Sequence, residues 1–302
     1  MNRIAVIGGG LMGAGIAQVF AAAGRETIVF EPSDEVRVSV VQRVADNLKS
    51  TGCDSSAAAL IAVTGNLAEA VGDAYFVTEA APEKLELKCS IFADLISHAP
   101  RECILASNSS VIPITRISEG LYTAERMVGT HWWNPPYLVP LVEVIQGEQT
   151  SNATIAATMT LLTEVGKSPA HVVKDTPGFV ANRLQHALWR EAIAMVAEGI
   201  CDAATLDACV KNSFGLRLPV LGPLENADLV GLDLTLDIHK TMMPELDRHA
   251  VPHSFLEAKV ANGDLGFKSG QGFRSWTNEE MQQLRKQLAD HLVAAQQRRE
   301  ST

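Results

Sequence analysis

A histidine and a glutamate stand in two neighbouring apolar segments of this chain, and together they could move a proton. His131 ends the apolar run of residues 127–131, and Glu143 lies inside the run of residues 141–145. Histidine suits the removal of a proton from a hydroxyl group near neutral pH, and a carboxylate beside it orients the imidazole and stabilises its cation. A carboxylate inside an apolar strand needs a partner, which His131 on an adjacent strand would supply. A structural role for His131 stays open from these two residues alone.

The segment of residues 8–13 has the G-x-G-x-x-G spacing of a dinucleotide-binding loop. A short apolar run precedes it and a helical pattern follows over residues 13–23, as a strand–loop–helix unit requires. Gly8 allows a tight turn, Gly10 lets the backbone approach a pyrophosphate, and Gly13 lets the helix pack closely on the strand. The unpaired N–H groups at the helix start face the phosphates. The loop residues predicted to contact the cofactor are Gly8, Gly10, Leu11, Met12 and Gly13.

Glu31 follows the apolar run of residues 27–30, which we expect to be the second strand. An acid at this place accepts hydrogen bonds from the adenine ribose and repels a 2′-phosphate, so the sequence predicts NAD rather than NADP. A flavin cofactor, or a glycine-rich turn of another α/β fold, remains an alternative. A dinucleotide loop indicates redox chemistry and names no substrate.

Composition excludes several kinds of partner. The formal net charge of −10 argues against nucleic acid as the main partner. The five cysteines are scattered and form no CxxC pair, so we expect no metal site and no disulfides, and we predict a cytoplasmic protein. No stretch has the roughly 20 apolar residues of a membrane span. The apolar start of the chain is interrupted by glycines, which fits a turn better than a signal peptide.

Short apolar runs bounded by turn residues predict further strands at residues 75–78, 104–107, 127–131, 141–145 and 171–173. Helical patterns lie between several of them, for example over residues 83–98 and 154–165. After residue 178 the pattern becomes helical throughout, with helices expected over residues 179–199, 203–211, 228–243, 255–262 and 279–298. Thr277 and Glu280 have the spacing of a capping box before the last of these.

Strands that alternate with helices predict an α/β fold. We expect residues 1–180 to form an NAD-binding domain with a Rossmann-type, doubly wound, mostly parallel sheet. Residues 181–302 are expected to form an all-α C-terminal domain for substrate binding and dimerisation.

Several motifs follow one another in an order that resembles the 3-hydroxyacyl-CoA dehydrogenase family over most of the chain. They are the glycine loop with Glu31, Ser107-Asn108-Ser109-Ser110, His131-x-x-Asn134-Pro135, Leu141-Val142-Glu143-Val144, Asp175-Thr176-Pro177-Gly178-Phe179-x-x-Asn182-Arg183, Gly222-Pro223 and Phe267-Lys268-Ser269-Gly270-Gln271-Gly272-Phe273. The set is far more specific than any one of its members.

The resemblance implies roles at the matching positions. His131 matches the family's catalytic base and Glu143 its paired carboxylate, Ser110 matches a serine near the substrate oxygen and the nicotinamide, and Asn182 matches an asparagine that completes the polar site. Further positions implied to contact the cofactor are Glu83, Lys88, Asn134 and Lys268. The resemblance also implies a homodimer formed through the helical domain, which closes over the substrate.

Each of these positions has a structural alternative. Ser110 and Asn134 could be turn residues before the prolines that follow them, and Asn182 could cap or brace a helix. Glu83 and Lys88 could be solvated charges on one helix, and Lys268 could lie on a mobile glycine-rich loop.

The sequence departs from the fatty-acid members of the family in the arm that follows the second strand. Those members carry a lysine-rich arm that meets the coenzyme A phosphates. Over residues 34–59 this chain has only three cations, against four acids: Arg37, Arg43 and Lys49, against Asp34, Glu35, Asp46 and Asp54. A net-acidic arm is a poor cradle for phosphates unless the three cations converge.

A second departure follows His131, where Trp132-Trp133 and Pro136-Tyr137 replace the usual phenylalanines and a different apolar stretch. This segment looks closer to relatives that act on free hydroxy acids, such as gulonate, carnitine and pyridoxine-breakdown dehydrogenases. Two indoles beside the base could narrow the pocket, or they could be core side chains.

The leading hypothesis is an NAD-dependent oxidation of a short L-3-hydroxyacyl-CoA to its 3-oxo form, a reaction of fatty-acid metabolism. A free hydroxy acid, oxidised by the same chemistry without CoA, is the close alternative. Two other classes remain: a dehydrogenase of the 6-phosphogluconate or hydroxyisobutyrate type, which uses a lysine base, and a crystallin-like protein that only binds the cofactor.

Overall fold

The computed structural model describes residues 3–300, which divide into two units. The first unit contains residues 3–182 and 289–300, and the second contains residues 183–288. The second domain expected from the sequence begins at residue 181, close to the start of this second unit. Residues 289–300, which we expected in the helical domain, group with the first unit instead.

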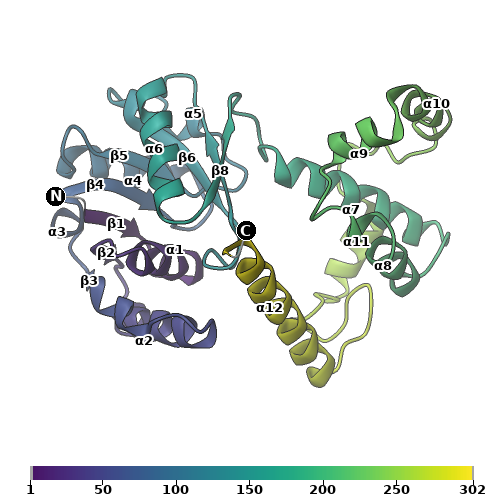
Figure 1. The fold of residues 1–302 in the computed structure, drawn as a ribbon, viewed down its shortest axis with the longest axis horizontal. Helices are drawn as coiled ribbons and strands as arrows, with labels where there is room; N and C mark the ends of the chain where they lie inside the picture. Colours follow the sequence, from purple (N-terminus) through teal and green to yellow (C-terminus); the bar gives the residue numbers. More distant parts are fainter. Residues whose placement is uncertain (1–2, 301–302) are drawn as a thin grey trace. The chain divides into compact units, whose positions relative to one another are not determined.

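One sheet of eight strands organises the first unit, in the order β3-β2-β1-β4-β5-β6-β7-β8 (Figure 1). The strands are β1 (Arg3–Ile7), β2 (Thr27–Phe30), β3 (Ile61–Thr64), β4 (Ala74–Glu79), β5 (Ile104–Ser107), β6 (Met127–Trp132), β7 (Leu141–Ile145) and β8 (Ser168–Val172). All neighbours are parallel except β6 and β7, which are antiparallel. The doubly wound, mostly parallel sheet predicted from the sequence is therefore confirmed. The strand order reverses between β1 and β4, and open α/β sheets bind ligands at the carboxyl ends of the strands at such a point.

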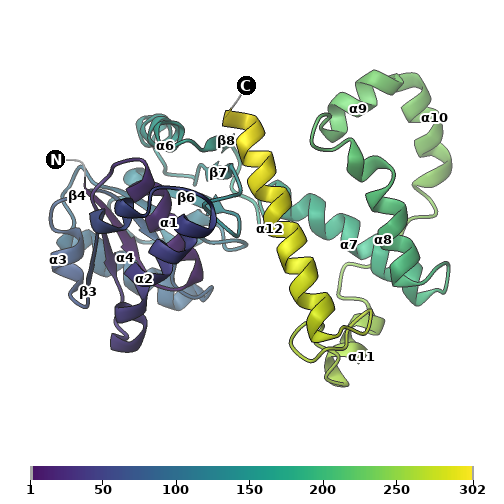
Figure 2. The same ribbon diagram turned by 60° about the horizontal axis from the view of Figure 1, so that its bottom comes forward.

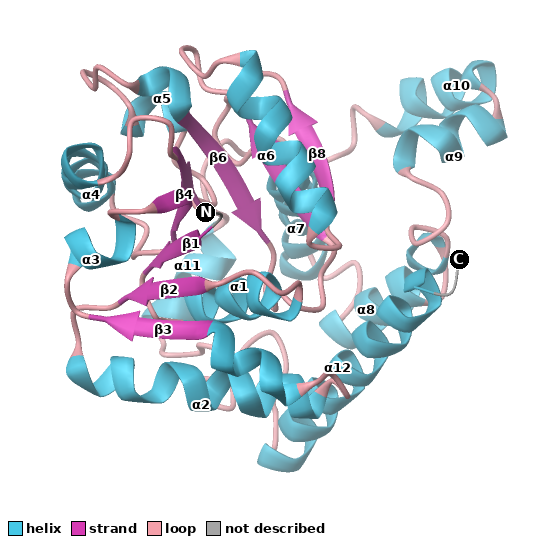
Figure 3. Cartoon of the chain, turned by 60° about the vertical axis from the view of Figure 1, so that its left-hand side comes forward, coloured by secondary structure: helices cyan, strands magenta, loops and turns pink. Residues whose placement is uncertain are grey.

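Helices cover both faces of this sheet (Figure 3). In the first unit they are α1 (Leu11–Ala22), α2 (Asp34–Ser50), α3 (Leu67–Val71), α4 (Leu85–His98), α5 (Ile114–Ile117) and α6 (Asn152–Glu164), with 3-10 turns at Ser55–Leu60 and Ala124–Arg126. One apolar core joins α1, α2 and α6 to one face, and a second joins α3, α4 and α5 to the other. Strands covered on both faces are apolar throughout, which is why they could be recognised as short continuous runs.

The second unit is helical, as the sequence predicted. Its elements are α7 (Ala181–Ala197), which begins in the first unit, α8 (Ala203–Lys211), a 3-10 turn at Phe214–Leu216, α9 (Pro223–Val230), α10 (Leu232–Met242), α11 (Ser254–Ala261) and α12 (Asn278–Glu300), which ends in the first unit. The single helix expected over residues 228–243 is wrong. Gly231, with φ of +103°, separates α9 from α10 and changes the chain direction (Figure 2).

The capping box predicted before α12 is present. The Thr277 N–H donates to Glu280 Oε2 (2.8 Å), and the Glu280 N–H donates to Thr277 Oγ1 (3.2 Å). Within residues 3–300, no helix is both long and apolar enough to span a bilayer.

Candidate active site

The glycine loop connects β1 to α1 at the point where the strand order reverses. Gly8 has φ of +107°, and a Cβ there would lie 2.9 Å from Ala80 O. A Cβ on Gly13 would lie 1.8 Å from Gly8 O, so the helix can approach the loop only without a side chain. A Cβ on Gly10 would meet open space, which leaves the backbone at the start of α1 accessible. These features fit a dinucleotide whose pyrophosphate lies on the N-terminus of α1.

Glu31 follows β2 and holds the turns around it. Its Oε2 accepts the Gly9 N–H (2.7 Å) and its Oε1 accepts the Ser33 N–H (2.9 Å). The carboxylate is thus fixed beside the glycine loop, where an adenine ribose would meet it.

The two arginines of α2 also turn toward this loop. Arg43 donates to Gly9 O (3.1 Å) and to Ser39 Oγ (2.7 Å). Arg37 donates to Glu31 O (2.6 Å) and forms an ion pair with Asp34. Two of the three cations in the arm therefore stabilise the backbone on the nucleotide side of the site.

His131 on β6 and Glu143 on β7 are direct partners in the antiparallel pair, as the sequence predicted. His131 Nδ1 lies 2.7 Å from Glu143 Oε2, and the two residues are 4% and 1% exposed. Because the carboxylate accepts, Nδ1 carries the proton, and Nε2 is the nitrogen with a lone pair. Among the described residues, none forms a hydrogen bond with Nε2.

Glu143 is held from its other side by the start of α7. Its Oε1 accepts the N–H groups of Val180 (2.9 Å) and Ala181 (3.1 Å). Burial by itself raises the pKa of Glu143, but the hydrogen bonds from His131, Ala181 and Val180 outweigh it and lower the pKa below its usual value. Glu143 therefore remains a carboxylate that can stabilise an imidazolium.

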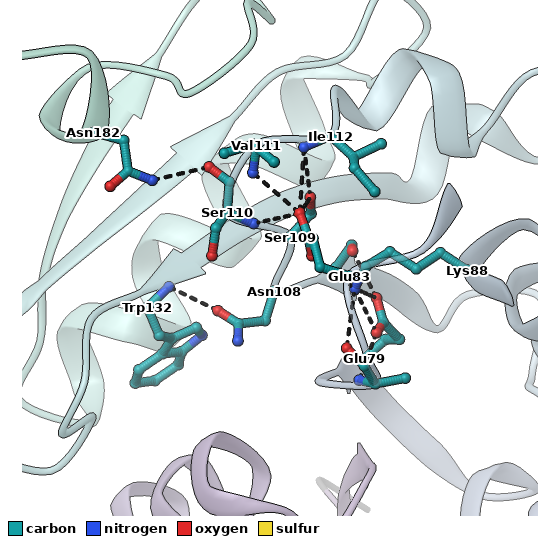
Figure 4. A network of polar contacts seen from close by, with 12 residues as sticks. Glu79, Glu83, Lys88, Asn108, Ser109, Ser110, Val111, Ile112, Trp132 and Asn182 are labelled. Carbon is teal, nitrogen blue, oxygen red and sulfur yellow. Dashed lines mark hydrogen bonds and ion pairs between the residues drawn. The ribbon is translucent and has the colours of Figure 1, made fainter. Parts of the chain in front are cut away.

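Ser110 and Asn182 come together, although they are far apart in the sequence. Asn182 Nδ2 donates to Ser110 O (3.0 Å), as Figure 4 shows. This bond joins the turn after β5 to the first residues of α7.

Glu83 lies in the loop before α4, not on the helix as we expected. Its Oε1 accepts Ser109 Oγ (2.5 Å) and the N–H groups of Ser110 (3.0 Å), Val111 (3.1 Å) and Ile112 (3.4 Å) (Figure 4). Burial raises the pKa of Glu83, but the hydrogen bonds from the turn and the charge of Lys88 outweigh it and lower the pKa.

Lys88 is 0% exposed, and its ammonium lies between two carboxylates. Nζ is 2.7 Å from Glu79 Oε1 and 3.5 Å from Glu83 Oε2. The cofactor contacts implied for Glu83 and Lys88 stay predictions, and these contacts show what each side chain binds within the protein.

The two tryptophans after His131 have different surroundings. Trp132 is 2% exposed and packs edge-on against Phe20 at 6.0 Å, so it belongs to the core. The Trp133 ring lies 5.3 Å from the His131 ring, beside the base. Asn134 follows at a cis peptide bond with Pro135, on the loop between β6 and β7.

Lys268 lies in the second unit, between α11 and α12. It lines a cavity of about 1280 Å³ whose lining residues all belong to that unit, among them Lys259, Phe273 and Trp276. The role implied for Lys268 at the cofactor stays a prediction.

The sequence analysis missed three residues that organise the site. Glu79 was noticed only as the position after an apolar run, and Ser109 and Asn108 only as parts of a motif. Asn108 Oδ1 accepts the Trp132 N–H (2.9 Å), which ties the turn after β5 to β6. A polar residue directly after a predicted strand, at the strand-order reversal, was the signal that could have identified Glu79.

The chain matches two family models in succession. Residues 3–176 match the NAD-binding domain of 3-hydroxyacyl-CoA dehydrogenase, and residues 178–276 match the C-terminal domain of the same family.

Individual relatives differ in substrate. The chain is 34% identical over 301 residues to the 5-formyl-3-hydroxy-2-methylpyridine 4-carboxylate 5-dehydrogenase of Mesorhizobium japonicum, covering 97% of each chain. A solved structure of an enzyme of this name, described as an NAD⁺-dependent dismutase, superposes with a TM-score of 0.90 at 31% identity, covering 97% of each chain. The (S)-3-hydroxybutyryl-CoA dehydrogenase of Ralstonia eutropha superposes with a TM-score of 0.77 at 33% identity, over 92% of this chain and 100% of that one.

Proposed function

Because the chain belongs to the 3-hydroxyacyl-CoA dehydrogenase family and is an NAD-dependent dehydrogenase acting on CH–OH groups, we propose that it oxidises the hydroxyl group of a small free acid. The observation that carries the substrate class is the orientation of Arg37 and Arg43. Both guanidinium groups bind backbone carbonyls around the glycine loop and so are not directed to a phosphorylated tail.

The proposed reaction divides the work between the cofactor and four side chains. Bound NAD supplies the acceptor for the hydride that leaves the alcohol carbon. His131 Nε2 accepts the hydroxyl proton, since Nδ1 is engaged by Glu143 (2.7 Å). The Glu143 carboxylate then stabilises the imidazolium, and Ser110 and Asn182 polarise the substrate oxygen. The lowered pKa of Glu143 supports this role, because a carboxylate is needed at neutral pH.

A short L-3-hydroxyacyl-CoA, the leading hypothesis from the sequence, is the second candidate. The match to both domains of the family and the likeness to the Ralstonia eutropha enzyme favour it. The likeness to the pyridine carboxylate dehydrogenase, over nearly the whole chain, favours the free acid.

A paired assay separates the two candidates. Free 3-oxo and 3-hydroxy acids, together with hydroxymethyl and formyl pyridine carboxylates, are compared with acetoacetyl-CoA at equal concentrations. We expect turnover of free acids and at least a tenfold lower kcat/KM for the thioester, about 1.4 kcal/mol in the barrier. A higher kcat/KM for the thioester overturns the free-acid proposal and leaves the hydride chemistry intact.

His131→Gln tests the base itself. We expect kcat to fall by about 10²- to 10⁴-fold, since a glutamine cannot accept the proton. Activity within a few-fold of the wild type would exclude His131 as the base and would favour a dehydrogenase with a lysine base. Trp133→Phe, which keeps a ring beside His131, is the matched control.

We also propose that the chain forms a homodimer through the second unit. Helices α9 and α10 bury none of their residues, and Leu224, Leu229, Leu232 and Leu236 are 57–80% exposed. Contiguous exposed apolar side chains of this kind mark association surfaces. Light scattering is expected to give twice the chain mass, and Leu229→Asp and Leu236→Asp together are expected to shift it to a monomer.

A further inference from the structure

Glu79 and Lys88 form a buried ion pair to which the reaction assigns no part. Both residues are 0% exposed, and Lys88 Nζ lies 2.7 Å and 2.9 Å from the two oxygens of Glu79. The carboxylate also accepts the Ala81 N–H (2.7 Å) and Ser107 Oγ (2.7 Å). The pair is therefore fully bonded, at the carboxyl end of β4 where the strand order reverses.

Stability alone is a weak reason for such a pair. Taking two charges out of water costs several kcal/mol for each ion, and apolar replacements of buried pairs are often neutral or stabilising. The contacts of Lys88 give another reason, because its ammonium also lies 3.5 Å from Glu83 Oε2.

Glu83 in turn determines the shape of the turn that carries Ser110. One of its oxygens accepts a side-chain hydroxyl and three consecutive N–H groups from residues 109–112 (Figure 4). Three N–H groups directed at one oxygen need a full negative charge at that place, and Lys88 compensates for that charge from the other side.

We propose that Glu79 and Lys88 are positioning residues for Ser110. Glu79 holds the Lys88 ammonium in place, Lys88 holds Glu83 as a carboxylate under the turn, and Glu83 fixes the backbone of Ser110. Asn182 holds the same residue from the opposite side through Ser110 O. The inference rests on the proposed function, in which Ser110 polarises the substrate oxygen, and it replaces a direct contact of Lys88 with the cofactor.

The test uses the double variant Glu79→Gln with Lys88→Met. A glutamine at position 79 can still accept from Ala81 and donate to Ser107, and a methionine fills most of the space of the lysine stem, so the fold is expected to persist. Asp73→Asn is the matched control, because Asp73 precedes the same strand and makes an exposed ion pair with Arg3.

We expect the double variant to lower kcat by about 10- to 100-fold, since a small displacement of a polarising group has effects of that size. The dissociation constant for NADH is expected to change by no more than about threefold, under 1 kcal/mol. In the protein without cofactor, the amide hydrogens of Ser110 and Val111 are expected to exchange faster. The control variant is expected to leave all three measurements unchanged.

Two results would overturn the inference: a folded double variant with a kcat close to that of the wild type, or a loss of NADH affinity as large as the loss of kcat. The second would return Lys88 to the cofactor. Failure of the proposed function is distinct, since it shows in the wild type and in His131→Gln.

Ser109→Ala keeps the test decisive if the double variant does not fold. It removes one donor to Glu83 and the acceptor of the Ile112 N–H (2.9 Å) while leaving the buried pair intact. A smaller loss of kcat with the same faster exchange supports the inference, and unchanged kcat and exchange contradict it.

Discussion

Two lysines of the first unit have their ammonium groups withdrawn from solvent, and they are stabilised in different ways. Lys88 lies between the carboxylates of Glu79 and Glu83. Lys167, after α6, donates to the backbone carbonyls of Pro136 and Val139. Among the described side chains, no carboxylate lies within ion-pair distance of Lys167.

The surroundings of Lys167 have a measurable consequence. Burial and, to a lesser extent, the charge of Arg299 lower the pKa of Lys167 to about 8. Other titratable groups near it are Tyr137, whose pKa is raised by burial, and Glu164, which is bound to Arg25 (2.6 Å). Carbonyl oxygens and the Trp132 ring, 5.7 Å from Nζ, thus compensate a buried cation less well than water does. The comparison teaches that hydrogen bonds alone do not keep a buried lysine charged.

The sharpest test of this difference is Lys88→Met as a single change. It leaves Glu79 buried and uncompensated, so we expect the free energy of unfolding to fall by about 3–5 kcal/mol. Guanidinium denaturation followed by circular dichroism measures the change. Asp73→Asn is the control, and a loss below 1 kcal/mol in the lysine variant would mean that the carboxylates do not depend on the cation.

The double variant Glu79→Gln with Lys88→Met sharpens the same point. With both charges removed, we expect most of the stability lost in the single variant to return, so the two changes are strongly non-additive by about 2 kcal/mol or more. The same denaturation experiment measures this coupling. Simple addition of the two single effects would show that Lys88 acts through packing rather than charge.

The comparison also shows what could be predicted from the sequence. The bounds of β5, β7 and α8 follow directly from continuous apolar runs or helical spacing between turn residues. β3 was not predicted, because its four residues, Ile61–Thr64, form a short edge strand with two half-buried positions. Local pattern records the burial of a segment well only when most of its side chains are buried.

The site divides in the same way. His131 and Glu143 could be paired from the sequence because both lie in apolar strands where an unpaired charge is costly. The burial of Lys88 could not, since nothing in the spacing of Glu83 and Lys88 indicates that Glu79 lies beneath them. Lys167 was not noticed at all, because its partners are backbone carbonyls, which carry no sequence signal.

Lys167→Met tests the pH dependence. A base whose pKa is about 8 in the folded state and 10.5 when unfolded loses its proton first in the folded state, so its contribution to stability increases as the pH rises from about 8 to 10.5. We expect this rise, about 2–3 kcal/mol in the wild type relative to the variant, to be absent in Lys167→Met. Denaturation at pH 7, 8, 9 and 10 measures it, and parallel curves for the two proteins would contradict the lowered pKa.

The smallest expected effect is that of Arg299→Gln on α12. Removing this exposed cation removes the weaker of the two causes, so the pKa of Lys167 rises but stays below 10.5 because burial remains. The shift is measured by NMR titration of the lysine side chain, and in the wild type it should shrink at high salt, since the guanidinium is exposed to screening ions. Arg285→Gln on the same helix is the control, because that guanidinium stacks on Phe267 at 5.4 Å. A return to 10.5 in Arg299→Gln would mean that charge repulsion, and not burial among carbonyls, separates Lys167 from Lys88.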